Sequence, residues 1–208
     1  MPSHTSFEHE SHAFSRKQAL SLAAVAGALA LTGCSSSNDS LADQADAGDS
    51  KGYIAGDGSV TEYPENERKE PVTFTGTLFD GTEVTADSLR GNPVLLNFWY
   101  AGCAPCRTEA PHLVKLYEQF GKKIKFYGVN VRDEKGTAEA FENSFKIPYP
   151  SFKDSAGKVL YDLSKYVPAQ AVPTTLILDQ QGRVAARILG EIDESILKTL
   201  LEDQSKSA

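Results

Sequence analysis

The sequence predicts an α/β fold with a mixed central sheet. Between Pro71 and Glu202, short runs of strand-forming residues alternate with segments of helical periodicity, which favours a sheet covered by helices. The last two predicted strands are separated only by the turn Asp179 to Arg183, so an antiparallel hairpin accompanies the strands that are joined through helices. With 208 residues, of which 40% are hydrophobic, the chain has the size of one ordinary domain plus accessory segments.

The predicted domain opens with a β-hairpin. Residues Val72 to Leu78 alternate with period two, Asp80-Gly81 is a turn signal, and Glu83 to Thr85 returns as the second strand. One helical turn follows at Asp87 to Gly91, where the glycine closes it. The next run, Val94 to Trp99, is short, apolar and bounded by turn residues, as is typical of a buried central strand.

The remaining predicted elements alternate between helix and strand until a final hairpin and helix. Helices are expected where apolar residues recur on one face, and strands where β-branched and aromatic residues concentrate. In chain order we expect a helix from Cys103 to about Phe120, a strand from Ile124 to Val131, a helix from Thr137 to Phe145, a short helix from Lys158 to Tyr166, strands from Thr174 to Leu178 and from Val184 to Leu189, and a helix from Glu194 to about Glu202. Pro111 lies inside the first of these helices and should kink it.

The first 34 residues have the pattern of an export signal. Arg16 and Lys17 precede an apolar stretch, Ala19 to Leu31, and small residues then lead to a cysteine. The sequence Leu31-Thr-Gly-Cys34 resembles the lipobox of bacterial lipoproteins. This resemblance implies that residues 1–33 are a lipoprotein signal peptide and that Cys34 is the lipidated first residue of the mature protein. A short buried helix ending near a free cysteine is the alternative.

Removal of residues 1–33 changes the set of reactive side chains. His112 becomes the only histidine, and with Cys34 lipidated the free thiols are Cys103 and Cys106 alone. The net charge stays at −7 because two basic and two acidic residues leave, and this charge argues against a nucleic-acid partner. No run of 18 apolar residues is present, so no membrane-spanning helix is expected in the mature protein.

The composition also predicts the domain boundaries. Residues 34–70 are rich in Ser, Asp, Ala and Gly, so we expect a lipid-attached flexible tether, and its part from Ser35 to Lys51 cannot bury enough apolar surface to fold. The stretch from Lys51 to Tyr63 is less clearly disordered, and the alternative there is that its scattered aromatic residues lie along the domain surface. The folded domain is expected over residues 71–204, and residues 205–208 are expected to be a tail.

The motif Cys103-Ala-Pro-Cys106 carries the predicted chemistry. It places two sulfurs between a buried strand and a helix N-terminus, where the helix dipole and unpaired N–H groups favour a thiolate. A zinc site requires about four protein ligands, which one such motif and one histidine do not supply, so no metal or other cofactor is expected. A structural disulfide remains an alternative, although so short a loop adds little stability. We expect a redox dithiol in which Cys103, the more exposed thiol, attacks a substrate disulfide and Cys106 resolves the mixed disulfide.

Several motifs together resemble one protein family. Asn97-Phe-Trp99, Cys103-Ala-Pro-Cys106, Pro111 and Val172-Pro173 are similar to the corresponding segments of the thioredoxin superfamily, and more closely to the TlpA/ResA-like thiol–disulfide oxidoreductases of the redoxin group. The resemblance covers about residues 71–202. It implies a thioredoxin-like fold in which a central mixed β-sheet is flanked by helices and carries an added N-terminal β-hairpin.

The resemblance also implies the roles of individual residues. Cys103 and Cys106 should form the redox-active disulfide, and Pro173 should be cis and pack against it. The backbone of Val172 should pair with a substrate chain as an added strand, and we expect Trp99, as a core or rim aromatic and not a catalytic group, to contribute to the same substrate-binding region. Without the motif, an ordinary trans proline would be expected at position 173.

Glu109, three residues after Cys106 on the same helix face, is the third predicted catalytic residue. The resemblance implies that an acid here lies near the cysteines, where it raises the thiol pKa and relays a proton. The alternative is an acid that only complements the helix dipole. Asn97 stands where cytoplasmic thioredoxins carry a buried acid, and Gly102 stands where many relatives carry Trp.

These observations predict a reductase tethered by its lipid to the extracytoplasmic face of the bacterial cell membrane. Its expected partners are disulfide-containing exported proteins, with apocytochrome c among them, and a membrane thiol donor of the CcdA/DsbD type. A disulfide oxidase, a peroxiredoxin-like antioxidant and a non-enzymatic lipid-anchored binding module are the alternatives. Peroxiredoxins carry Thr three residues before their reactive cysteine, and Tyr100 at that position disfavours this alternative. The residues between the cysteines, Ala104-Pro105, do not indicate whether the reaction runs as reduction or oxidation.

Overall fold

The computed structural model describes residues 59–206 of the chain. The predicted signal peptide, the predicted lipidation site Cys34 and most of the predicted tether lie outside these residues. Within the described part, no helix is both long enough and apolar enough to cross a bilayer.

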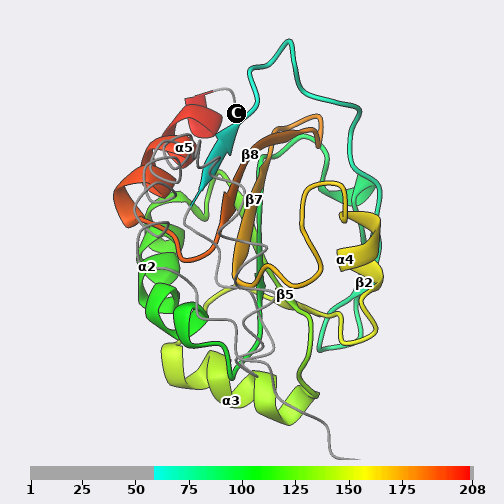
Figure 1. The fold of residues 1–208 in the computed structure, drawn as a ribbon, viewed down its shortest axis with the longest axis vertical. Helices are drawn as coiled ribbons and strands as arrows, with labels where there is room; N and C mark the ends of the chain where they lie inside the picture. The colour runs from blue at the N-terminus through cyan, green and yellow to red at the C-terminus, as the bar shows by residue number, and fades with distance from the viewer. Residues whose placement is uncertain (1–58, 207–208) are drawn as a thin grey trace, which may run out of the picture. The chain divides into compact units, whose positions relative to one another are not determined.

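A six-stranded mixed sheet forms the centre of the described domain (Figure 1). Its strands are β1 (Val60–Glu62), β4 (Val94–Trp99), β5 (Lys125–Asn130), β6 (Ser151–Lys153), β7 (Thr174–Leu178) and β8 (Val184–Leu189). Their order across the sheet is β1-β8-β7-β4-β5-β6. The pairs β4–β5 and β5–β6 are parallel, and the pairs β4–β7, β7–β8 and β1–β8 are antiparallel. A separate hairpin is made of β2 (Thr75–Thr77) and β3 (Glu83–Thr85).

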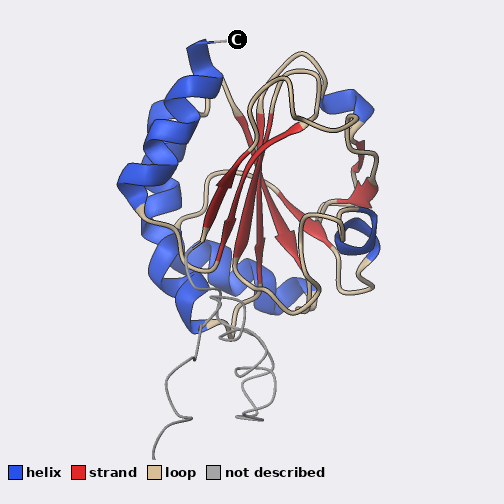
Figure 2. Ribbon diagram, turned by 45° about the horizontal axis from the view of Figure 1, so that its top comes forward, coloured by secondary structure: helices blue, strands red, loops and turns tan. Residues whose placement is uncertain are grey.

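Helices and the hairpin cover the two faces of the sheet. The helical elements are the 3₁₀ turn η1 (Asp87–Leu89) and the α-helices α2 (Ala104–Phe120), α3 (Lys135–Phe145), α4 (Lys158–Asp162) and α5 (Glu194–Lys206). Helices α2 and α5 pack on one face, whereas the hairpin, η1 and α4 pack on the other, as Figure 2 shows. The predicted α/β architecture with an added N-terminal hairpin is therefore confirmed.

Strand β4 is buried along its whole length, and its successive side chains point alternately into the two core clusters on either face of the sheet. Leu96 and Phe98 pack in the cluster beneath the hairpin and α4, and Leu95 packs in the cluster formed with α2 and α5. Full burial of each such side chain contributes about 1.5–3 kcal/mol. Asn97 shares the face of Leu95 because side chains two positions apart point the same way. The strand therefore directs one amide toward α2.

Two short strands lie where the sequence predicts none. Val60–Glu62, within the predicted tether, pairs with β8, and Ser151–Lys153, within a predicted connection, pairs with β5. Each spans only three residues, too few for the period-two pattern to stand out, and each obtains its hydrogen bonds from a longer neighbour. The folded part of the chain therefore begins before residue 71, and the predicted tether boundary is too late.

Two helix ends also differ from the prediction. Helix α4 ends at Asp162 and not at Tyr166, because the chain turns at Leu163. The Leu163 carbonyl accepts hydrogen bonds from the N–H groups of Tyr166 and Val167. Helix α5 continues to Lys206, beyond the predicted end of the domain at residue 204, and an ion pair between Lys206 and Asp203 lies in its last turn.

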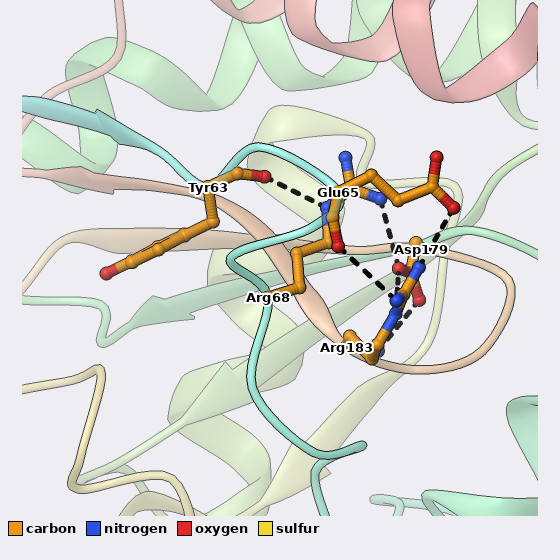
Figure 3. A network of polar contacts seen from close by, with 5 residues as sticks. All are labelled: Tyr63, Glu65, Arg68, Asp179 and Arg183. Carbon is orange, nitrogen blue, oxygen red and sulfur yellow. Dashed lines mark hydrogen bonds and ion pairs between the residues drawn. The ribbon is translucent and has the colours of Figure 1, made fainter.

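A polar network ties the segment after β1 to the turn between β7 and β8 (Figure 3). The Asp179 carboxylate accepts hydrogen bonds from Arg68 Nη1 at 3.0 Å and from Arg183 Nε at 2.8 Å. Arg68 also donates to the Tyr63 carbonyl, and Arg183 contacts Glu65 at 3.3 Å. The Asp179 side chain is only 5% exposed, so two guanidinium groups neutralise an almost buried charge.

We expect the substitution Asp179→Asn to destabilise the domain. It leaves two partly buried arginines without their shared carboxylate, and loss of such a buried partner costs about 1.5–3 kcal/mol in the free energy of unfolding. Urea denaturation of the oxidised protein measures this loss. Glu65→Gln is the matched control, because the Glu65 side chain is 79% exposed and should contribute less than about 0.5 kcal/mol. Equal losses in the two variants would contradict the assignment.

Candidate active site

The two cysteines lie where β4 passes into α2. Cys103 is the N-cap of the helix, with Pro105 among the first helical residues, and its sulfur is bonded to that of Cys106 across a Cα–Cα distance of 5.3 Å. The backbone N–H of Cys106 donates to the Cys103 sulfur at 3.2 Å. After reduction the same N–H, together with the helix dipole, would stabilise a thiolate on Cys103.

Both cysteines are buried in the oxidised protein. Cys103 is 0% exposed and Cys106 is 2% exposed, so the prediction that Cys103 is the more exposed sulfur is wrong for this state. The reason is an apolar cluster around the disulfide that includes Tyr100, Phe141 and Val172. A helix N-terminus alone, which is what the sequence indicates, does not reveal this cover.

The loop before β7 approaches the disulfide from the opposite side. The Val172–Pro173 peptide bond is cis, as predicted, and the Val172 carbonyl oxygen lies 3.9 Å from the Cys103 sulfur. A disulfide sulfur carries no proton to donate, so this approach becomes a hydrogen bond only when Cys103 is a thiol. Pro173 lies here because Thr174, the next residue, pairs with Phe98 near the end of β4.

Trp99 occupies the core beneath this site. It is 4% exposed, and its ring centroid lies 4.4 Å from that of Phe141 on α3. The structure therefore gives Trp99 a packing role, and the predicted contact with a substrate chain is not available in this arrangement. Its position as the last residue of β4, with its side chain on the α2 face of the strand, accounts for the burial.

Glu109 is fully buried and held by two donors from different parts of the fold. Asn97 Nδ2 on β4 donates to Oε1 at 2.7 Å, and the backbone N–H of Ile192 donates to Oε2 at 3.1 Å. The same Asn97 amide also contacts Thr175 Oγ1 on β7 at 3.2 Å. Glu109 therefore does more than complement the helix dipole, because its carboxyl joins three elements inside the core.

Burial sets the protonation of this carboxyl. Desolvation raises the pKa of Glu109 from 4.5 to about 8, and the nearby charge of Glu191 also raises it. The hydrogen bonds from Asn97 and Ile192 favour the ionised form and oppose the shift, but they are the smaller effect. The carboxyl is consequently mostly neutral at pH 7 and titrates close to the ordinary thiol pKa of about 8.5.

A small cavity lies behind the disulfide. It measures about 10 Å³, and Asn97, Cys106 and Tyr149 supply its polar lining. That volume is near the lower limit for one water molecule. The cavity therefore offers a place for a single water beside the resolving cysteine.

Some residues of the site could not have been found from the sequence. Ile192 acts through its backbone N–H, so its side chain carries no signal. Asp133, whose carboxylate accepts a hydrogen bond from the Ala101 N–H at 2.6 Å, holds the loop before Cys103 from a distant position in the chain. Of the predicted residues, Cys103, Cys106 and Val172 share one buried cluster, the cis-Pro173 follows Val172, and Glu109 lies one helical turn after Cys106. Cys34 lies outside the described residues.

Comparison with known proteins identifies a family. A sequence profile described as the AhpC/TSA family matches residues 68–187, more than half of the chain. The thiol:disulfide interchange protein DsbE of Pseudomonas aeruginosa is 33% identical over 119 residues, which are 57% of this chain and 62% of that protein. The thiol–disulfide oxidoreductase ResA of Bacillus subtilis is 30% identical over 121 residues, 57% of this chain and 64% of that protein. The matched region therefore spans less than two thirds of either relative.

Solved structures share the fold. A DsbF homologue from Corynebacterium diphtheriae matches with a TM-score of 0.61 and 33% identity, over 71% of this chain and 94% of that chain. A secreted thiol–disulfide isomerase from Corynebacterium glutamicum matches with a TM-score of 0.64 and 28% identity, over 72% and 94%. The predicted thioredoxin-like fold is thereby confirmed. The chain belongs to the AhpC/TSA family, and its relatives there include thiol–disulfide oxidoreductases of the ResA and DsbE type.

Proposed function

We propose that this chain is a membrane-tethered thiol–disulfide oxidoreductase that reduces disulfides of exported proteins outside the cytoplasm. The observation that carries the proposal is the Cys103–Cys106 disulfide at the start of α2, with the cis-Pro173 loop 3.9 Å away through the Val172 carbonyl. This arrangement combines a stabilised thiolate with an adjacent backbone segment on which a client strand can pair.

The first half of the reaction takes place at Cys103. In the reduced protein its thiolate attacks one sulfur of a client disulfide, which forms a bond between Cys103 and the client and breaks the client disulfide. The second client sulfur leaves as a thiolate and takes a proton from solvent. The Cys106 N–H and the N-terminus of α2 stabilise the attacking charge.

The second half takes place at Cys106 and requires a proton acceptor. The Cys106 thiolate attacks the Cys103 sulfur, so that the protein disulfide forms and the client leaves with both of its sulfurs reduced. The client has then gained two electrons from the protein, its two thiolates have taken their protons from solvent, and the proton of Cys106 is on Glu109. Glu109 suits the proton transfer because its pKa of about 8 lies close to that of a thiol, so exchange in either direction costs little.

The same pair of groups serves the return reaction. When a thiol donor attacks the Cys103 sulfur of the oxidised protein, Cys106 leaves as a thiolate, and the neutral Glu109 can supply its proton. We assign the donor to the membrane thiol carriers of the CcdA/DsbD type. The clients are disulfide-containing exported proteins, with apocytochrome c as one candidate.

The extracytoplasmic location rests on the first 34 residues and on the relatives. The segment ending in Leu31-Thr-Gly-Cys34 has the length, charge and small residues of a lipoprotein signal, and the similar protein from Corynebacterium glutamicum is described as secreted. A diacylglycerol on Cys34 supplies two acyl chains, which suffice for stable membrane attachment.

Reduction of a model client tests the proposed activity. With dithiothreitol as the electron source, the wild-type protein should reduce insulin, and Cys103→Ser should fall to the background rate of dithiothreitol alone. Cys106→Ser should instead accumulate a mixed disulfide through Cys103, because the resolving sulfur is missing. Peroxide consumption faster than disulfide reduction would favour the peroxiredoxin alternative, and equal insulin reduction by Cys103→Ser would refute the catalytic assignment.

Titration in glutathione buffers decides the direction of the same reaction. A potential near that of thioredoxin, about −270 mV, supports a reductase. A value near that of DsbA, about −120 mV, would make the protein an oxidase and overturn the assigned direction.

The pKa of Glu109 predicts how stability depends on pH. Because the pKa is raised from 4.5 to about 8 on folding, the folded state keeps a proton that the unfolded state loses as the pH rises through 4.5. Between pH 4.5 and 8 the free energy of unfolding of the oxidised protein should therefore fall by up to about 1.4 kcal/mol per pH unit. Glu109→Gln should remove this slope, and Glu118→Gln, on the exposed face of α2, should retain it. Parallel curves for the wild-type protein and Glu109→Gln would contradict the shifted pKa.

The proposed lipid on Cys34 predicts that the protein leaves the membrane when this cysteine is replaced. Cys34→Ala should move the protein from the membrane fraction to the soluble extracytoplasmic fraction, and metabolic labelling with palmitate should disappear. Cys103→Ser, which removes a different cysteine, should keep both the label and the membrane location. Continued labelling of Cys34→Ala would place the lipid on another residue and overturn the assignment of Cys34.

A further inference from the structure

The loop between β8 and α5 contacts both the cis-proline segment and the buried carboxyl. The Gly190 N–H donates to the Pro173 carbonyl at 2.8 Å, and the Ile192 N–H donates to Glu109 Oε2 at 3.1 Å. The two donors lie only two residues apart. A displacement of the Pro173 loop can therefore reach Glu109 through one short piece of backbone.

The loop is braced on its C-terminal side. Asp193 Oδ1 accepts hydrogen bonds from the N–H groups of Ser195 and Ile196 and so caps α5. Glu194 pairs with His112 at 2.7 Å and with Lys115, both on α2. The C-terminal end of the loop is therefore held against α2, the helix that carries Glu109. A displacement of Gly190 consequently moves mainly the residues between Gly190 and Asp193.

A second connection reaches the Glu109 carboxyl from β7, the strand that follows Pro173. Asn97 Nδ2, which donates to Glu109 Oε1, also contacts Thr175 Oγ1, and Thr175 follows Pro173 by two residues. One carboxyl oxygen is thus bonded to an amide that also contacts Thr175, and the other is bonded to an N–H two residues from Gly190, which contacts Pro173. The arrangement links the surface on which a client strand would pair to the group that would exchange a proton with Cys106.

We propose that the Gly190–Asp193 loop is a positioning element through which contact of a client with the Val172–Pro173 segment controls the Glu109 carboxyl, with the Ile192 N–H as the controlling donor. This inference rests on the proposed disulfide exchange. Its consequence is that the proton exchanged with Cys106 responds to client docking. The step adds no electrons: a proton moves from the Cys106 thiol to the Glu109 carboxylate before Cys106 attacks.

Other charged groups around Glu109 have to be considered in any pH measurement. Glu191, on the same loop, carries a like charge that raises the pKa of Glu109. Tyr149 lines the same cavity, and burial together with the charges of Glu109 and Glu142 raises its pKa well above the usual range. Cys106 lies one helical turn before Glu109, but in the oxidised protein its sulfur is part of the disulfide and does not titrate. The test variants therefore leave all three side chains unchanged.

Amide-to-ester substitution tests the donor without altering any side chain. Replacement of Ile192 by its α-hydroxy acid removes the N–H that favours ionised Glu109. The pH at which the stability of the oxidised protein stops falling should then rise by about one pH unit. Ile192→Val keeps the N–H and should keep the wild-type midpoint. In a Glu109→Gln background the ester should produce no shift, since the titrating group is gone.

The corresponding ester at Gly190 tests the coupling itself. Glycolic acid at this position removes only the N–H that contacts Pro173, so a local structural role would raise the KM for the client and leave the Glu109 midpoint unchanged. The proposal expects both the KM and the midpoint to change. An unshifted midpoint in the Gly190 ester, with the protein folded, would overturn the coupling.

The readouts separate this inference from the proposed function. Stability against pH reports on Glu109 in the oxidised protein and requires no activity. If the midpoints shift as expected but the wild-type protein reduces no disulfide, the proposed function fails and the link between the loop and the carboxyl stands. If insulin is reduced but neither ester moves the midpoint, the proposed function stands and the link between the loop and the carboxyl fails.

Discussion

Burial of one carboxyl beside a buried disulfide is the constraint on which the structure of the site depends. An ionised carboxylate is costly in a core without partners, so Glu109 both shifts its pKa and takes two hydrogen bonds. Its donors come from β4 and from the loop before α5. The position of Glu109 therefore requires the sheet, α2 and that loop to be assembled together, and a change in any of them alters the surroundings of the carboxyl.

The site also depends on the pairing register of β7 with β4. Antiparallel pairing of β7 with β4 sets Thr174 opposite Phe98, which brings Pro173 to the end of the sheet where Cys103 begins α2. A slip by one residue would turn Asn97 away from α2, because the side-chain period of a strand is two. The contacts of both Pro173 and Glu109 thus depend on the same strand pairing.

At the opposite end of β7 a different device maintains the fold. Asp179 binds Arg68 and Arg183 and holds the segment between β1 and the hairpin against the turn (Figure 3). No residue of this network belongs to the disulfide site. Stability at one end of the sheet and reactivity at the other can therefore vary independently, as is expected of sites that share no partners.

The sequence by itself determined the elements that have strong local signals. The period-two hairpin, the apolar run of β4 and the Cys103-Ala-Pro-Cys106 helix start all follow from residues close together in the chain. The cis form of Pro173, in contrast, is implied by the family resemblance and not by its neighbours in the sequence. The three-residue strands β1 and β6 could not be predicted, because their stability comes from longer neighbours and not from their own pattern. The N-terminal signal that predicts lipidation likewise depends on local residues alone.

Only the tertiary structure decided how the site is enclosed and connected. The sequence indicates that Glu109 lies one turn after Cys106, but the contact of its carboxyl with the Ile192 N–H joins positions 83 residues apart through the backbone. The burial of Cys103 likewise depends on Tyr100, Phe141 and Val172, which meet only after folding. Exposure and proton affinity are properties of the packed environment, and the surroundings of a side chain are set by long-range contacts that a local pattern does not contain.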